Sequence, residues 1–125
     1  MRVGITVAGQ HPIDGTKLML EVANGMGAES VWMPDHILGV FHPDLWPEMA
    51  YSKMAADPDA FYDPFVVSGV LGTMTDKAVG ISVTDSTRRK AADLARTALT
   101  LQHLVPGRFI LRIVSGDAES LTPFG

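Results

Sequence analysis

Short apolar runs alternate with longer helix-like segments along the whole of this 125-residue chain. The runs typical of buried strands cover residues 3–8, 30–33, 78–83 and 108–114. The predicted helices lie between them, at residues 16–24, 65–74 and 90–104. Strands that alternate with helices in this way favour a parallel sheet whose crossover connections are right-handed. The order of the elements therefore predicts an α/β fold.

Local signals mark the starts of two of these helices. Asp63 followed by Pro64 is typical of a helix N-terminus, because aspartate can cap the helix and proline at the first position loses no needed hydrogen bond. Thr87 is predicted to cap the last helix, where apolar residues from Leu94 to Val105 recur on one face.

Three of the predicted strands end in polar side chains. These are Asp35 and His36 after the second strand, Thr84 and Asp85 after the third, and Ser115 and Asp117 after the fourth. Because the carboxyl ends of parallel strands meet at one edge of a sheet, we expect these groups to form a single site there.

The connection at residues 34–63 is unusually long for a compact domain. It is rich in proline and aromatic residues, and we expect a short helix at residues 46–56. The excursion is predicted to cover the edge that carries Asp35 and His36. Its aromatic side chains either line a pocket or only pack the excursion onto the domain, and the sequence leaves both readings open.

The composition excludes several classes of protein. With 46% hydrophobic and 19% charged residues, the chain is too apolar to be disordered. No apolar run approaches the ~18 residues of a membrane span. The net charge of −4 argues against sequence-independent binding of nucleic acid. The small basic cluster at residues 88–90 is interpreted as the solvated start of a helix.

The absence of cysteine excludes disulfides and thiolate metal sites, and the histidines show no metal-ligand spacing, so no metal is expected. The chain leads directly into a strand-like run without the pattern of a signal peptide. The cytoplasm is therefore the expected compartment.

Several stretches, in order along the chain, resemble the bacterial luciferase-like superfamily. They are residues 27–36, 62–65, 80–89, 99–104, 107–111 and 115–119. The sequence is most similar to the deazaflavin (coenzyme F420)-dependent oxidoreductases, including enzymes like mycobacterial phthiodiolone ketoreductase. Members of this superfamily fold as a TIM (β/α)8 barrel, which needs about 250 residues. Residues 1–125 are thus expected to form one partial domain, the N-terminal half of such a barrel.

The resemblance implies a catalytic role for three residues. In such enzymes an Asp-His pair after the second strand contacts the deazaflavin ring and reaches the substrate, which implies Asp35 and His36. An acid after the fourth strand, usually glutamate, lies near the ring, and Asp117 takes that place. A histidine can supply or remove the proton that accompanies hydride transfer at a carbonyl or an alcohol. Asp35 could orient the imidazole or bond to the ring.

The resemblance also implies a set of cofactor contacts. A bulge with a non-prolyl cis peptide bond backs the ring in such enzymes, and it would fall between Ser82 and Val83. The full set of predicted cofactor-binding residues is Asp35, Ser82, Val83, Thr84, Ser115 and Asp117.

Four positions depart from the family pattern. Arg112 and Val114 stand where members commonly have glycine, and Val40 lies near the place of a tryptophan that some relatives carry. If Arg112 points into the barrel, it is a buried charge that needs a partner. Asp117 is one methylene shorter than the usual glutamate, and a displacement of an ångström can cost about 10²-fold in rate.

The leading hypothesis is hydride transfer between coenzyme F420 and a small carbonyl or alcohol substrate. An FMN-dependent monooxygenase of the same superfamily is the alternative. A third hypothesis is that the 125-residue chain is a catalytically inactive fragment. Half a barrel has two unpaired sheet edges, so we expect a homo-oligomer or pairing with a separate C-terminal half.

Overall fold

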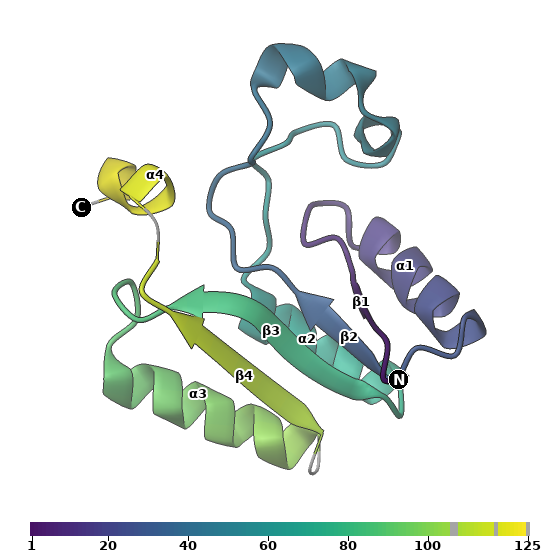
Figure 1. Ribbon diagram of the computed structural model, residues 1–125, viewed down its shortest axis with the longest axis vertical. Helices are drawn as coiled ribbons and strands as arrows, with labels where there is room; N and C mark the ends of the chain where they lie inside the picture. Colours follow the sequence, from purple (N-terminus) through teal and green to yellow (C-terminus); the bar gives the residue numbers. More distant parts are fainter. Residues whose placement is uncertain (106–107, 117, 125) are drawn as a thin grey trace.

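The computed structural model describes residues 1–105, 108–116 and 118–124 (Figure 1). Its four strands are β1 (Gly4–Thr6), β2 (Ser30–Met33), β3 (Ala78–Asp85) and β4 (Phe109–Val114). They form one sheet in the order β1-β2-β3-β4, and each strand is parallel to its neighbour. The predicted parallel α/β arrangement is therefore confirmed.

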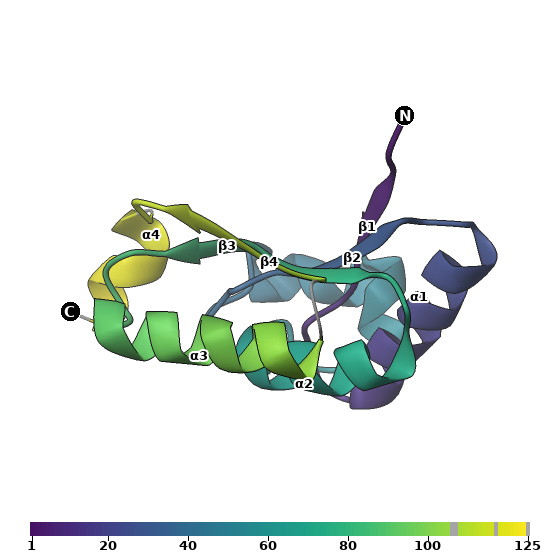
Figure 2. The ribbon, with the colours of Figure 1, turned by 90° about the horizontal axis from the view of Figure 1, so that it is seen from below.

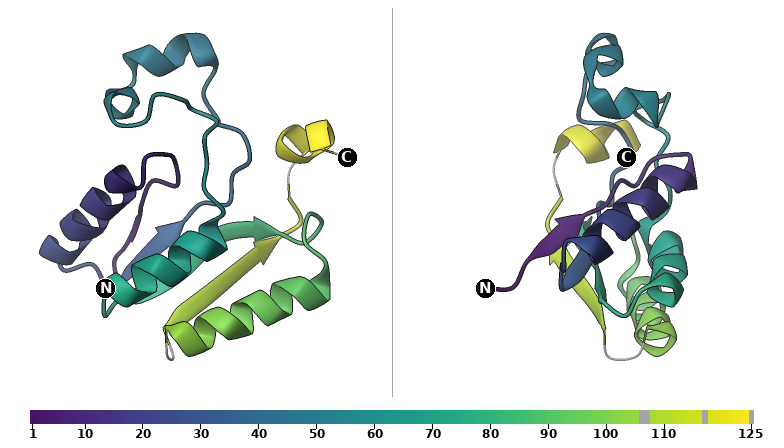
Figure 3. Two further views of the ribbon diagram at one scale, coloured as in Figure 1. Left: turned by 180° about the vertical axis from the view of Figure 1, so that it is seen from behind. Right: turned by 90° about the vertical axis from the view of Figure 1, so that its right-hand side faces the viewer.

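The long helices cover one face of this sheet, and the opposite face is bare (Figure 2). They are α1 (Ile13–Gly25), α2 (Pro64–Met74) and α3 (Ala91–Leu104), and a short α4 (Ala118–Leu121) follows β4. Seen from behind, α2 and α3 lie side by side against the strands (Figure 3). Among the described residues, none of the helices has both the length and the apolar character that crossing a membrane requires.

The core lies between the sheet and these helices. Val31 and Met33 of β2 and Val79 and Ile81 of β3 are fully buried and alternate with residues that point to the bare face. Leu71 and its neighbours on the helices pack against them. One face of β2 and of β3 therefore packs against the helices.

The bare face is organised around Trp32. Its indole lies so close to Gly4 and Gly80 that an added Cβ at either position would approach it to 2.4 and 2.5 Å, respectively. The indole N–H donates to Ser30 Oγ at 2.9 Å. Arg112, which was expected to be buried and to need a partner if it pointed into the barrel, is exposed on this face, and its guanidinium lies 5.8 Å from the Trp32 ring centroid.

The long connection contains two 3₁₀ helices, η1 (Pro43–Glu48) and η2 (Ala50–Lys53), so the single helix predicted at residues 46–56 is wrong. Pro47 has no N–H for a helical hydrogen bond, and Met49 between them is extended at φ −76° and ψ 136°. Trp46 is buried, and its indole donates to the Ala55 carbonyl within the connection at 2.8 Å. This tryptophan therefore packs the excursion itself.

Other element ends differ from the prediction by a few residues. Helix α1 begins at Ile13, and β3 continues to Asp85 because a bulge lets it pair with β4 again beyond Ile81. Thr87 does not cap α3, since Lys90 occupies the cap position and the Thr87 hydroxyl donates to Asp85.

Candidate active site

The carboxyl ends of β2, β3 and β4 meet around a cavity of about 260 Å³. The residues that line it are Asp35, His36, Ser82, Val83, Asp85, Arg88, Val114, Gly116 and Leu121. Four predicted site residues therefore lie together at this edge. Thr84 is also there, but it is buried and its hydroxyl faces Asp35. Ser115 is exposed and is not in this lining, and Asp117 lies outside the described residues.

The peptide bond between Ser82 and Val83 is cis. The pairing register between β3 and β4 shifts between Ile81 and Thr84, so a bulge surrounds this bond. Both features lie where the resemblance predicted them, and those two structural predictions are confirmed. The role of the bulge in backing a cofactor ring stays a prediction.

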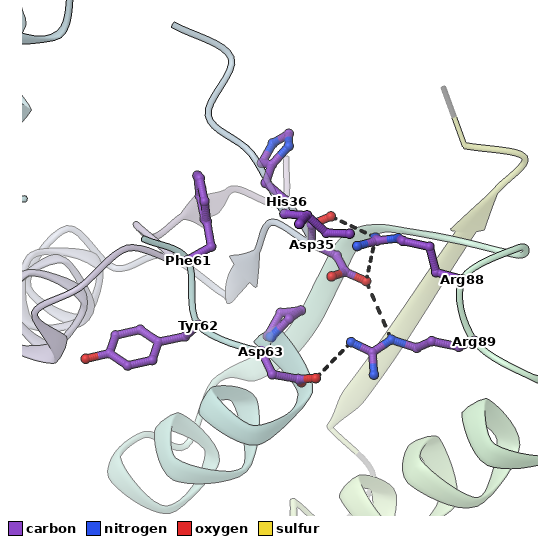
Figure 4. Close-up of a pocket in the computed structure, with 9 residues that line it drawn as sticks. Asp35, His36, Phe61, Tyr62, Asp63, Arg88 and Arg89 are labelled. Atoms are coloured by element: carbon purple, nitrogen blue, oxygen red, sulfur yellow. Dashed lines mark hydrogen bonds and ion pairs between the residues drawn. The ribbon is translucent and has the colours of Figure 1, made fainter. Parts of the chain in front are cut away.

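Asp35 is held by groups on and after β3 (Figure 4). Its side chain is only 3% exposed, and Thr84 Oγ1 donates to Asp35 Oδ2 at 2.6 Å. Nη2 of Arg88 lies 3.1 Å from the same oxygen, and Nε of Arg89 lies 3.8 Å from it. The imidazole of His36 points to the opposite side of the chain. The Asp35 carboxylate thus contacts Thr84 and two arginines. Among its described contacts there is none with the His36 imidazole that would orient the ring.

Arg88 and Arg89 line the candidate site and were missed by sequence analysis. The expectation that residues 88–90 form a solvated helix start is wrong for these two, whose side chains are 20% and 29% exposed. The Arg88 guanidinium pairs with Asp85, and Arg89 Nη2 lies 2.9 Å from Asp63 Oδ2. A signal was present, because two arginines shortly after a strand that ends in aspartate are placed to pair with carboxylates at the same edge.

Two of these aspartates have lowered pKa values. Burial opposes the ionisation of Asp85, but hydrogen bonds from the backbone and guanidinium of Arg88 and from Thr87 outweigh it, so its pKa falls far below the usual range. Burial likewise opposes the ionisation of Asp63. The hydrogen bond from Arg89 and those from N–H groups at the start of α2 lower the pKa of Asp63.

The lowered pKa of Asp85 makes the stability of this edge pH-dependent. Its contribution is complete above the pKa of an unfolded aspartate, about 3.9, and is lost as the pH falls through the lower folded value. We expect Asp85→Asn to lower the free energy of unfolding at pH 7 by on the order of 2 kcal/mol. The deficit should shrink as the pH falls below about 4, because the Asp85 carboxyl of the unfolded wild-type chain then takes up a proton while that of the folded chain stays ionised.

Denaturant unfolding from pH 7 to pH 2 measures this difference. Asp93→Asn is the matched control, because Asp93 pairs with Arg96 on the exposed surface of α3 and should change stability by no more than about 0.5 kcal/mol. A deficit for Asp85→Asn that stayed constant down to pH 2 would contradict the assignment.

His36 borders a second cavity as well. This space of about 370 Å³ is lined by Asp35, His36, Ile37, Phe61, Tyr62, Asp63, Pro64, Arg88 and Arg89. The His36 and Phe61 rings lie 5.5 Å apart, tilted by 52°, and His11 stacks on Tyr62 at 3.8 Å. The aromatics at the C-terminal end of the excursion therefore line a pocket, whereas Trp46 packs the excursion internally.

The family model described as luciferase-like monooxygenase matches residues 1–125. The chain belongs to this family. It is 34% identical over 113 residues to a phthiodiolone/phenolphthiodiolone dimycocerosates ketoreductase of Mycobacterium sp. (strain JLS), covering 82% of this chain and 30% of that protein. It is 38% identical over 104 residues to the Mycobacterium kansasii ketoreductase of the same description, covering 79% and 28%. The chain thus spans about 30% of the length of the curated relatives it matches.

Two solved structures have a similar fold over nearly the whole of this chain. The coenzyme F420-dependent tetrahydromethanopterin reductase of Methanopyrus kandleri matches with a TM-score of 0.73 at 21% identity, over 99% of this chain and 30% of that one. Riboflavin lyase, solved with modified FMN and riboflavin, matches with a TM-score of 0.72 at 16% identity, over 98% and 32%. The four strands and their helices therefore have the fold of part of a TIM barrel, as the resemblance implied.

Proposed function

We propose that this chain contributes part of the active site of an oxidoreductase that transfers a hydride between coenzyme F420 and a carbonyl or alcohol substrate. The observation that carries the proposal is that His36, Ser82 and Val83 line the same cavity at the carboxyl ends of the strands. The names of the mycobacterial ketoreductases and of the F420-dependent reductase support the reaction class.

The cavity suits one face of a flat ring. Val83 and Val114 offer apolar contacts, and Ser82 and His36 offer polar ones, which is the mixture that ligand pockets use. Ser82 and Val83 would hold the ring, with Ser115 and Asp117 proposed beside it. Thr84 would act through Asp35, because its hydroxyl is already bonded there. When bound, the deazaflavin supplies the centre that accepts or donates the hydride.

His36 is proposed to handle the accompanying proton. Reduction of a ketone leaves a developing alkoxide, and an imidazolium within hydrogen-bond reach can donate a proton to that oxygen. In the reverse direction the neutral imidazole removes the hydroxyl proton of the alcohol. The groups that hold the Asp35 carboxylate do not block the imidazole, because they lie on the other side of the chain.

The direct test uses the complete protein that contains these residues. We expect reduced F420 to be oxidised when a ketone is added, and the return of the deazaflavin absorbance measures this oxidation. One molecule of alcohol should form for each molecule of cofactor that is oxidised. The same assay without a ketone should give no turnover, which separates hydride transfer to substrate from slow reaction with air.

An FMN-dependent monooxygenase remains the second candidate, because a structure that holds modified FMN matches this chain almost as well as the F420-dependent reductase does. The two candidates differ in their use of oxygen. Binding of FMN in preference to F420, together with oxygen uptake that depends on substrate, would replace the proposed function by this alternative.

A further inference from the structure

Charged side chains around Asp35 form a continuous chain of contacts. In spatial order they are Asp85, Arg88, Asp35, Arg89 and Asp63, and we call these five residues the arginine clamp. They come from the ends of β2 and β3, from the turn before α3 and from the start of α2. Three carboxylates outnumber two guanidinium groups, so the cluster is not built to receive an anion.

Arg88 is fixed at its base before it reaches Asp35. The carboxylate of Asp85 accepts hydrogen bonds from the backbone N–H and the Nε of Arg88, and also from the N–H and hydroxyl of Thr87. Asp85 is itself buried at the end of β3. The position of the guanidinium is therefore set by the strand and not by its own flexible side chain.

The far end of Arg88 holds the main chain next to His36. Its Nη2 donates to the backbone carbonyl of Asp35 at 2.9 Å. That carbonyl belongs to the peptide unit that joins Asp35 to His36, and a peptide unit is planar, so fixing its oxygen also fixes the direction in which His36 leaves it. Thr84 and both arginines hold the carboxylate of the same residue.

Arg89 links Asp35 to the start of α2. It pairs with Asp63, whose carboxylate caps α2 by accepting the N–H groups of Phe65 and Val66. The guanidinium also lies 4.5 Å from the centroid of the Phe65 ring. Asp63 follows directly on Phe61 and Tyr62, which line the pocket with His36.

We propose that Arg88 and Arg89 are positioning residues, which set the place of the His36 imidazole by holding Asp35 between β3 and the start of α2. The proposal rests on the proposed function only in treating the place of His36 as important for catalysis. A buried ion pair gives little net stability over an apolar replacement, whereas it fixes geometry through directional hydrogen bonds.

The test follows the His36 ring by NMR in the complete protein, with histidine labelled at Cε1 and the signal assigned by its loss in His36→Gln. We expect Arg88→Met to move or broaden the His36 signal. Arg88→Lys should do so too, because lysine keeps the charge but cannot bridge Asp85 and the Asp35 carbonyl as a planar fork does. Arg96→Met, which removes an exposed pair on α3, should leave the signal in place.

Thr84→Val is the second variant, since it removes one hydrogen bond to Asp35 with little change in shape. It decides the matter if Arg88→Met fails to fold, and we expect a smaller displacement of the same signal. An unmoved His36 signal in the folded Arg88→Lys and Thr84→Val proteins would overturn the proposal. In an assay of F420 oxidation, the kcat of the Arg88→Lys protein should be about tenfold lower than that of the wild type, and its KM should be unchanged. Displacement of the signal without any F420 reaction would refute the proposed function alone.

Discussion

Replacement of His36 by asparagine is expected to slow hydride transfer by about 10²- to 10⁴-fold, which is the usual contribution of a positioned general acid or base. Asparagine keeps a polar group of similar size but cannot exchange a proton near neutral pH. His36 lines both cavities at the carboxyl ends of the strands, and under the proposed function the carbonyl oxygen of a bound substrate would face it there.

Single-turnover oxidation of reduced F420 by a ketone measures this effect without interference from product release. The matched control is His103→Asn in the last turn of α3, where the imidazole is exposed and not among the residues that line either cavity. Equal rates in the two variants would remove His36 from the mechanism.

The parallel order of the strands could be predicted because each local pattern agrees with the global one. Residues 30–33 alternate between the core and the bare face, and the structure places β2 at those same residues. Asp63 before Pro64 begins α2 as expected, with the aspartate accepting two backbone N–H groups. Such signals depend on residues that are close together in the sequence, so they can be recognised in one sequence alone.

The contacts of the candidate site depend on distant residues, and the sequence could place them only in part. Polar strand ends predicted that Asp35 and His36 would lie beside β3, which the cavity bears out. The pairing of Arg88 with Asp85, three residues earlier, had a local signal that was not used. Its other partner, Asp35, is 53 residues away, and no local pattern indicates that contact. The cis bond at Ser82–Val83 followed from the resemblance to a family and not from the residues themselves.

The second large effect is expected on stability, from a substitution in the hydrophobic core between α2 and β3. We expect Leu71→Ala to lower the free energy of unfolding by about 2–5 kcal/mol, since it leaves a cavity in a well-packed interior. Leu71 lies on α2, is 0% exposed and belongs to the core cluster that includes Val79 and Ile81 of β3. Few apolar neighbours can move to fill the space, because the strands on one side are fixed by the sheet.

Leu99→Ala is the matched control for this substitution, as it removes the same atoms from a side chain that is 64% exposed on α3. Its effect should be no more than about 0.5 kcal/mol, as for other surface changes. Chemical denaturation of both variants in the complete protein gives the comparison. Similar losses would mean that α2 does not pack on β3 as described, and the position of Asp63 at the start of α2 would then no longer support the arginine clamp.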